Sequence, residues 1–256
     1  MAVAFVKRAI GQTATNVTTL TATLGSAPAT GNLLVFKMAG DKNNGALTLA
    51  GWTQIYSLLT TNVSLYYWWK VSDGSETSIS PSWATTSVNG NTYHYAEYED
   101  AAVSGSTWQV SAQASHTSDD LNYTSWSTGT TGTIGAAGLA IAMMALDSAD
   151  SVTDGTTAWT NSYTPRYTTL FSAGAHGAIH VAEKTVTAGG TTDSTFSYTA
   201  ANSPRDQLSG AVVVFSKGSE DIAAVGRTDA AAHLYAVTGS AFTPAGRTDA
   251  AADARA

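Results

Sequence analysis

The chain has no cysteine and few charged side chains: Asp, Glu, Lys and Arg together make up 12% of its 256 residues. The lack of cysteine excludes disulfide bonds and metal sites built from thiolates. The charged share is about half of that in an ordinary soluble domain. The length suits one large sandwich or two small domains, and a chain of this size can bury enough surface to fold without covalent cross-links.

Basic residues are scarcer than acidic ones, with 12 Lys and Arg against 19 Asp and Glu, and the formal charge is −7. Binding to nucleic acid requires Lys and Arg to neutralise the phosphates. Docking on an anionic membrane surface depends on the same positive charges. We therefore expect neither a nucleic acid nor a membrane as a partner.

Long hydrophobic runs are also absent. The most apolar run, 136–146, is much shorter than the roughly 20 residues that span a bilayer, so we interpret it as a buried strand. Residues 1–16 lack the apolar stretch after a basic start that marks a secretory signal, and we expect no export by that route.

Short apolar or alternating runs recur between clusters of turn-forming residues. Pairs such as Asp73-Gly74 and Gly189-Gly190 supply the positive φ angles of tight hairpins. Many short strands with frequent turns predict an all-β antiparallel sandwich or barrel. The predicted strands include 33–39, 65–71, 93–99, 139–146, 178–184 and 211–215.

The order of these features repeats along the chain. An apolar strand near Gly31 is followed by Trp52, and a second apolar strand near Gly138 is followed by Trp159. We predict a duplicated β unit, about 3–100 and 108–217, whose copies are either separate sandwiches or the two Greek keys of one jelly roll. Because no linker rich in Pro, Gly or charge separates them, we favour one jelly-roll-like domain over 1–217.

The end of the chain, 218–256, is rich in Ala and Asp, and its segment 226–232 recurs at 246–252. Two copies are too few for a repeat array. We expect a C-terminal tail that is flexible, or an arm that becomes ordered on a neighbouring subunit.

One set of motifs resembles a known class of proteins. It consists of an apolar strand at 31–35, a Gly-Trp strand from Gly51, an aromatic strand at 64–70 followed by the hairpin 73–77, and a strand that ends near Glu99. This order is similar to that of structural proteins of tailed-bacteriophage particles, such as head decoration proteins and minor tail proteins, over residues 3 to about 217.

The resemblance implies a non-enzymatic component of a virion that decorates or stabilises the capsid or the tail. Its partners would be other virion structural proteins and further copies of itself, for example in a trimer. The protein would be located in the virion after assembly in the host cytoplasm. The resemblance offers no catalytic residues, and we predict no cofactor and no metal.

Two groups of residues could instead carry chemistry. Glu97 and Glu99 would share one face of a strand, and paired carboxylates are the catalytic groups of glycosidases. A glycoside hydrolase is therefore our third hypothesis. For this pair of residues, we favour a solvated edge or a subunit contact. His176 and His180 are the only close pair of histidines. On a strand they would be roughly 13 Å apart, too far for one metal ion.

Aromatic residues form the most informative pattern. Alternation in 64–71 places Leu65 and Tyr67 toward the core. If the Glu97 face of the next aromatic strand points outward, an exposed aromatic stripe results, made of Tyr66, Trp68, Tyr93 and Tyr95.

Such a stripe suits a protein interface or sugar stacking, and the alternative is that a second layer or a loop covers it. No cluster of Asp and Asn with the spacing of calcium ligands accompanies the stripe. We therefore favour protein contacts, and a carbohydrate-binding, lectin-like module is the second hypothesis.

Overall fold

Every regular element in the described part of the computed structural model is a β-strand, and all of the strand pairings there are antiparallel, which confirms the predicted all-β class. These residues belong to one compact unit, Met1–Glu220. They contain no helix long and apolar enough to cross a membrane. The structure describes residues 3–13, 17–41, 45–60, 63–84, 90–100, 107–118, 125–147, 154–168, 177–200 and 207–218.

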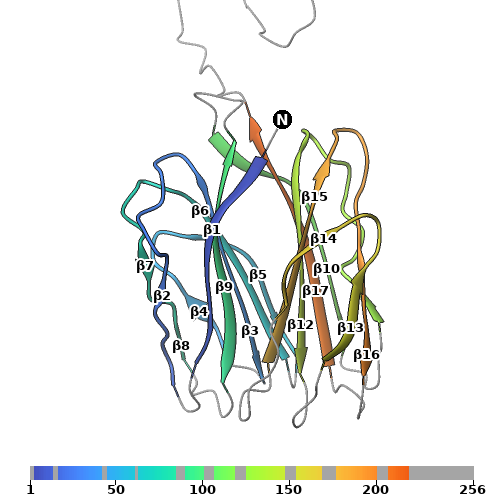
Figure 1. Ribbon diagram of the computed structural model, residues 1–256, viewed down its shortest axis with the longest axis horizontal. Helices are drawn as coiled ribbons and strands as arrows, with labels where there is room; N and C mark the ends of the chain where they lie inside the picture. The colour runs from blue at the N-terminus through green and yellow to red at the C-terminus, as the bar shows by residue number, and fades with distance from the viewer. Residues whose placement is uncertain are drawn as a thin grey trace, which may run out of the picture. The chain divides into compact units, whose positions relative to one another are not determined.

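The first half of the chain builds one large sheet and two small ribbons (Figure 1). The ribbons pair β2 (Ala22–Thr23) with β7 (Ser78–Ile79), and β4 (Leu47–Thr48) with β8 (Ser82–Trp83). The large sheet has the order β1 (Val3–Gln12), β9 (Asn91–Asp100), β3 (Leu33–Asp41), β6 (Val63–Val71) and β5 (Thr53–Leu59).

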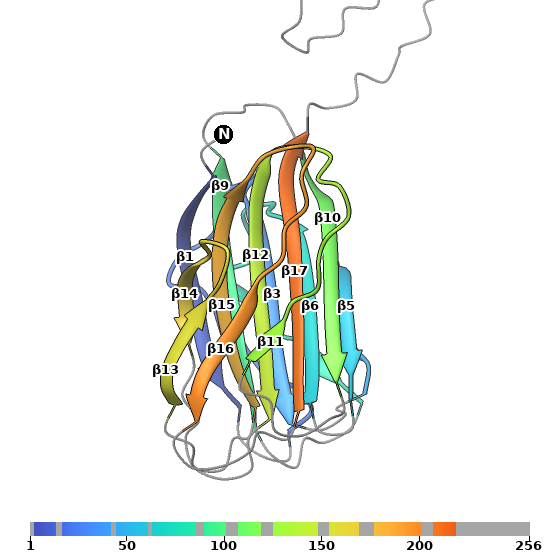
Figure 2. The same ribbon diagram turned by 90° about the vertical axis from the view of Figure 1, so that its right-hand side faces the viewer.

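The second half builds a second large sheet and a three-stranded sheet that lies over its outer face (Figure 2). The large sheet has the order β10 (Thr107–Ser118), β17 (Gln207–Gly218), β12 (Gly138–Asp147), β15 (Gly177–Val186) and β14 (Thr164–Thr168). The smaller sheet has the order β11 (Ser125–Ser127), β16 (Thr195–Ala200) and β13 (Asp154–Trp159). The strands predicted at 139–146, 178–184 and 211–215 are confirmed as β12, β15 and β17.

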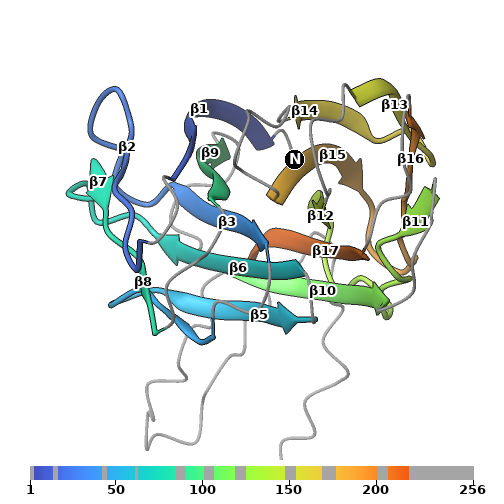
Figure 3. The ribbon, with the colours of Figure 1, turned by 90° about the horizontal axis from the view of Figure 1, so that it is seen from below.

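The two large sheets pack face to face, and their inward side chains form the main core (Figure 3). Further apolar clusters fill the space between each large sheet and its own outer layer. The central strands β3 and β12 are therefore buried on both faces, which explains why they read as continuous apolar runs rather than as alternating ones.

The two halves have equivalent sheets. In chain order, the strands of each large sheet are arranged as first, fifth, second, fourth and third. The register agrees residue by residue: Leu33 pairs with Val71 and Tyr98, and Leu139 pairs with Thr185 and Phe215. The described strands of each half pair only within that half, so the halves meet through side-chain packing.

All four edge strands of the large sheets carry a register shift. The shift in β1 lies opposite Tyr98, and the shift in β10 lies opposite the equivalent residue, Phe215. Those in β5 and β14 also face equivalent positions, Trp68 and Ala182. The pairings between inner strands run without a shift over the described residues. Bulges at edges hinder pairing with another sheet, so these edges are protected against edge-to-edge association.

The predicted turn at Asp73-Gly74 is confirmed, because Gly74 has a φ of 94°, which is favourable only for glycine. The predicted tail, 218–256, lies outside the described residues apart from Gly218, the last residue of β17.

Candidate functional site

The predicted exposed aromatic stripe is buried. Tyr66 and Tyr95 have no exposed surface, Trp68 is 7% exposed, and Tyr93 is partly buried. The prediction of an exposed surface is therefore wrong. The physical reason is that the two ribbons cover this face, where Leu24, Ile79 and Trp83 pack against the aromatic rings. The predicted core face, with Leu65 and Tyr67, is confirmed as the inter-sheet face.

The hydroxyls of this face bind the covering loops. Tyr66 Oη donates a hydrogen bond to the Gly45 carbonyl at 2.6 Å, and Tyr95 Oη donates to the Glu76 carbonyl at 2.5 Å. Burial raises the pKa of Tyr66 to about 12 and raises that of Tyr95 as well. These rings hold the outer layer in place and are not accessible to a ligand.

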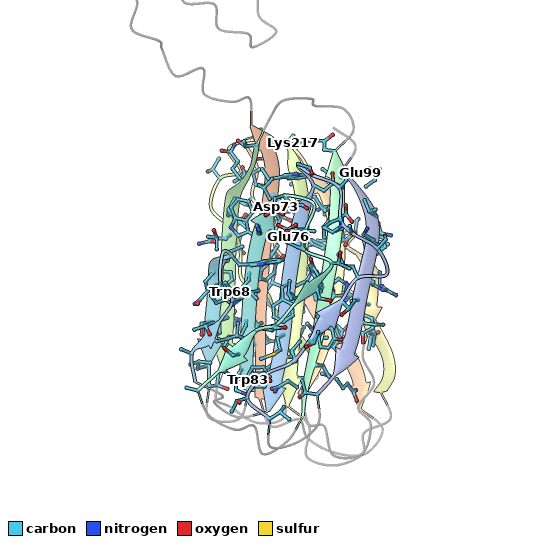
Figure 4. All side chains as sticks on the ribbon, turned by 90° about the vertical axis from the view of Figure 1, so that its left-hand side faces the viewer. Trp68, Asp73, Glu76, Trp83, Glu99 and Lys217 are labelled. Carbon is cyan, nitrogen blue, oxygen red and sulfur yellow. The ribbon has the colours of Figure 1, made fainter. Side chains whose placement is uncertain are left out.

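Glu97 and Glu99 do not form an acid pair. Glu97 is buried and forms an ion pair with Lys7 at 3.1 Å, and its other oxygen accepts hydrogen bonds from Ala29 N and Asn32 Nδ2. Glu99 is exposed, and Figure 4 places it near the end of the sheet. Glu97 therefore attaches the loop before β3 to β1 and β9 and has a structural role.

The predicted pair of histidines is described only in part. His180 is buried with its ring 4.4 Å from that of Phe196, and its predicted neighbour His176 lies outside the described residues. Among the residues that the structure describes, no group of three or more His, Asp or Glu side chains could hold a metal ion.

The hairpin after β6 contains a network of charged side chains (Figure 4). Lys70 Nζ lies 2.5 Å from Glu76 and 3.0 Å from Asp73. Hydrogen bonds from Ser75, together with Lys70, hold the pKa of Asp73 well below its usual range. The ammonium group of Lys70 thus occupies the position between the two carboxylates, and the residues of the Asp-Gly-x-Glu motif fix a turn.

A set of polar side chains lies between the two large sheets, and we call it the inter-sheet polar cluster. Lys37 on β3 is flanked in register by His94 on β9 and Tyr67 on β6, and all three are buried. Lys37 Nζ has no hydrogen-bond partner among the described residues and lies 5.5 Å from the centre of the Tyr67 ring. The other members are Tyr98, Glu183 and Arg166.

Burial determines the ionisation of this cluster. Desolvation lowers the pKa of Lys37 to about 7, although the charge of Glu183 acts in the opposite direction. Desolvation, and then the positive charges of Lys37 and Arg8, lower the pKa of His94 well below its usual value. At neutral pH His94 is therefore uncharged, and burial favours the neutral amine of Lys37.

Glu183 on β15 connects the two sheets. Its Oε1 atom accepts a hydrogen bond from Tyr98 of the first sheet at 2.7 Å, and its Oε2 atom accepts one from Arg166 Nε at 2.6 Å. Arg8 of β1 donates to the backbone carbonyl of Arg166, and the Arg166 guanidinium lies 6.0 Å from the Phe5 ring centre. The carboxylate is thus held from both halves of the chain.

A pocket of about 360 Å³ opens beside this carboxylate, and we call it the β14–β15 pocket. Its volume lies in the range of small-molecule sites, about 300–1,000 Å³. It is lined by Val3, Leu139, Ser162, Thr164, Arg166, Glu183, Lys184 and Thr185.

The sequence alone predicts neither the cluster nor the pocket. One signal was available for Lys37, because a lysine in the middle of the apolar run 33–39 is expected to be buried. Arg166, Glu183 and Lys184 carry no motif, and the pairing of β14 with β15 determines their proximity.

Comparison of the chain with family models, with curated proteins and with solved structures finds no match.

Proposed function

We propose that the chain is a non-enzymatic structural component of a tailed-bacteriophage virion, which decorates or stabilises the capsid or the tail through protein–protein contacts. The resemblance in the sequence is the first support. The second is the role of the motif residues: Asp73 and Glu76 hold a turn around Lys70, and Gly31 has a φ of 85° at the turn before β3. The motif thus encodes a scaffold, which agrees with a structural role.

The observation that carries this proposal is that the buried carboxylates form ion pairs that hold the layers of the fold together. Glu97–Lys7 and Glu183–Arg166 each have a carboxylate no more than 3% exposed, and each attaches one β layer to a neighbouring layer or loop. Carboxylates held in this way stabilise a rigid body, whereas an acid catalyst needs access to its substrate.

We also propose that the two halves are copies of one jelly-roll unit. This is the alternative with two separate sandwiches, and it replaces the favoured prediction of a single jelly roll over 1–217, because the described strands of each half pair only within that half. In the first half the outermost strands pair as β1 with β9, the next as β2 with β7, and the next as β3 with β6; in the second half the same nesting gives β10–β17, β11–β16 and β12–β15. Nested pairing of two Greek keys is the connectivity of a jelly roll. The equivalent registers and edge bulges support duplication.

Contacts with partners would use the outer layers and the loops, since the edges of both large sheets are bulged. We expect a symmetric homo-oligomer within the particle, with other virion proteins as further partners. Residues 219–256 are the other candidate for attachment. Comparing the mass in solution of the full chain with that of a chain truncated after Gly218 tests whether this segment drives association.

The direct experiment is quantitative mass spectrometry of purified virions of the phage or prophage that encodes the chain. We expect the protein in a fixed copy number that matches the symmetry of the head or the tail, and labelled antibody in electron micrographs should identify which. Absence of the protein from purified particles contradicts the proposal.

A further inference from the structure

We propose that the inter-sheet polar cluster selects the partner of each half, so that a first half packs against a second half and not against the first half of another copy. We call the inward face of the first large sheet the first face and that of the second large sheet the second face. The proposal rests on the equivalence of the two halves and does not depend on a role in a virion.

The two faces pack with an approximate twofold symmetry. β9 contacts β15 and β6 contacts β17, and these two contacts are equivalent, because β9 corresponds to β17 and β6 corresponds to β15. β9 and β17 also end close together, where Lys217 Nζ donates a hydrogen bond to the Asp100 carbonyl. The approximate axis is therefore parallel to the strands. Because the same symmetry relates two copies of one surface in a homodimer, geometry alone does not decide which faces meet.

The hydrogen bond between Tyr98 and Glu183 forms only when unlike faces meet. Tyr98 Oη donates to Glu183 Oε1 at 2.7 Å, and both side chains are buried. The first half has Trp69 at the position equivalent to Glu183, and the second half has Phe215 at the position equivalent to Tyr98. Two first faces would place Tyr98 against Trp69, and two second faces would place Glu183 against Phe215. Each like pairing therefore deprives a buried polar group of this partner, which is unfavourable.

Two further residues of the first face oppose its pairing with a copy of itself. Lys37 and His94 are fully buried, and neither side chain has a hydrogen-bond partner among the described residues. Desolvation lowers the pKa of Lys37, and the negative charge of Glu183 acts in the opposite direction. Two first faces would bury two copies of Lys37 and of His94 and would place no Glu183 opposite them, which is more costly still. A buried polar residue can select one pairing at a cost in stability, as asparagine does in coiled coils.

The test converts the first face into the second and detects pairing of like faces between full-length chains. The converted variant carries Lys37→Met, Tyr67→Val, His94→Ala and Tyr98→Phe, which are the residues at the equivalent positions of the second half. Because the chain has no cysteine, Val35→Cys on the inward side of β3 can serve as a reporter. β3 contacts its equivalent strand β12 in the chain. In a pair of first faces β3 would therefore contact β3 of the other copy, and the two cysteines can form a disulfide.

Each chain is refolded from urea and then oxidised, and the disulfide-linked dimer is measured by electrophoresis without a reducing agent. We expect at least about tenfold more dimer from the converted variant than from the original chain with the same reporter, because the original chain loses the hydrogen bond of Tyr98 in such a pair. The Val35 position is buried in the folded chain, so association through other surfaces does not link it. Ser125→Cys, at an exposed position of β11, measures chance cross-linking in each background.

Lys37→Met with the Val35→Cys reporter is the matched control. It removes the buried amine and keeps Tyr98, so its dimer should stay close to the level of the original chain. A dimer as abundant as that of the converted variant would overturn the role given to Tyr98 and Glu183. A smaller variant, Lys37→Met with Tyr98→Phe, repeats the test with two changes and should also exceed the original chain.

Two results overturn the proposal as a whole. The first is dimer at the chance level of Ser125→Cys in both the converted and the smaller variant. The second needs no change beyond the reporter: abundant disulfide-linked dimer from the original chain with Val35→Cys would show that like faces pair despite the polar cluster.

Discussion

The inward faces of the two large sheets have the same geometry but different chemistry. The face of the second sheet carries one buried charged residue, Glu183, and is otherwise mostly apolar, whereas the first sheet carries polar groups at four positions whose equivalents in the second sheet are apolar. The equivalent pairs are Lys37 and Met143, Tyr67 and Val181, His94 and Ala211, and Tyr98 and Phe215. Strand order, register and bulges are the same in both sheets, so the fold does not require the polar residues.

The comparison also shows where stability is lost. A buried amine without a hydrogen-bond partner is costly, since neither form of the group recovers the interactions that it made with water. Replacing buried charged groups with apolar side chains of similar volume is often neutral or stabilising. Met143 is such a side chain at the equivalent position. We therefore expect the inward face of the first sheet to contribute less to the free energy of unfolding than the inward face of the second sheet.

The largest effect is expected from making the second face resemble the first. Met143→Lys places a lysine at a fully buried position of β12 among apolar neighbours and should reduce the free energy of unfolding by about 3–5 kcal/mol. Urea unfolding near neutral pH measures this loss, and Met143→Leu is the control, with an expected loss below about 1.5 kcal/mol. Similar losses in the two variants would show that the second face tolerates a charge, and the comparison would fail.

The reverse change should stabilise the protein. Lys37→Met gives the first face the residue of the second and should raise the free energy of unfolding by about 1–4 kcal/mol near pH 7. Urea unfolding of the variant and of the original chain measures the difference. A loss of stability in the variant would mean that Lys37 makes favourable interactions in the folded state.

The stability gained in Lys37→Met should depend on pH in a defined direction. The pKa of Lys37 is about 7 in the folded chain and near the ordinary 10.5 in the unfolded chain, so between these values the unfolded chain binds more protons. The stability of the original chain therefore rises with pH across this window. The advantage of Lys37→Met should be largest at pH 7 and below, and should shrink toward pH 10.5. An advantage that does not change with pH would contradict a buried, titrating Lys37.

Variants of two tyrosines should change the stability by an intermediate amount. Tyr98→Phe removes the hydroxyl that donates to Glu183 and should cost about 1–3 kcal/mol, because a buried carboxylate oxygen loses its partner. Tyr67→Phe is the matched control. The Tyr67 hydroxyl is buried without a partner among the described residues, so its removal should be neutral or stabilising. Equal effects in thermal unfolding would contradict the assigned role of Glu183 as the connection between the sheets.

The part of the fold that the sequence predicts well depends on local rules. Alternation separated Leu65 and Tyr67 from Tyr66 and Trp68, and the structure confirms that they lie on opposite faces of β6. Turn pairs such as Asp73-Gly74 predict a turn because only glycine readily accepts the required backbone angle. These features involve neighbouring residues, so the sequence displays them directly.

The part that could not be predicted depends on layers formed by distant segments. The exposure of Trp68 is determined by ribbons at residues 22–23, 47–48, 78–79 and 82–83, which are too short to be recognised as strands. The same holds for Glu183, whose partners Tyr98 and Arg166 come from two other strands. Alternation tells which residues share a face, but it does not tell whether another layer covers that face.

The smallest effect separates the two equivalent lysines, Lys70 and Lys184. Lys70→Gln removes the ammonium group from between Asp73 and Glu76 and should cost about 0.5–1 kcal/mol, the range of partly exposed ion pairs. Lys184→Gln should change stability by less than about 0.5 kcal/mol, because Lys184 contacts a ring and no carboxylate in the described residues. High salt should reduce the cost for Lys70 and leave Lys184 unaffected. If thermal unfolding shows the same cost for both lysines, then Lys184 has a structural partner of its own, and the contrast between the two equivalent positions fails.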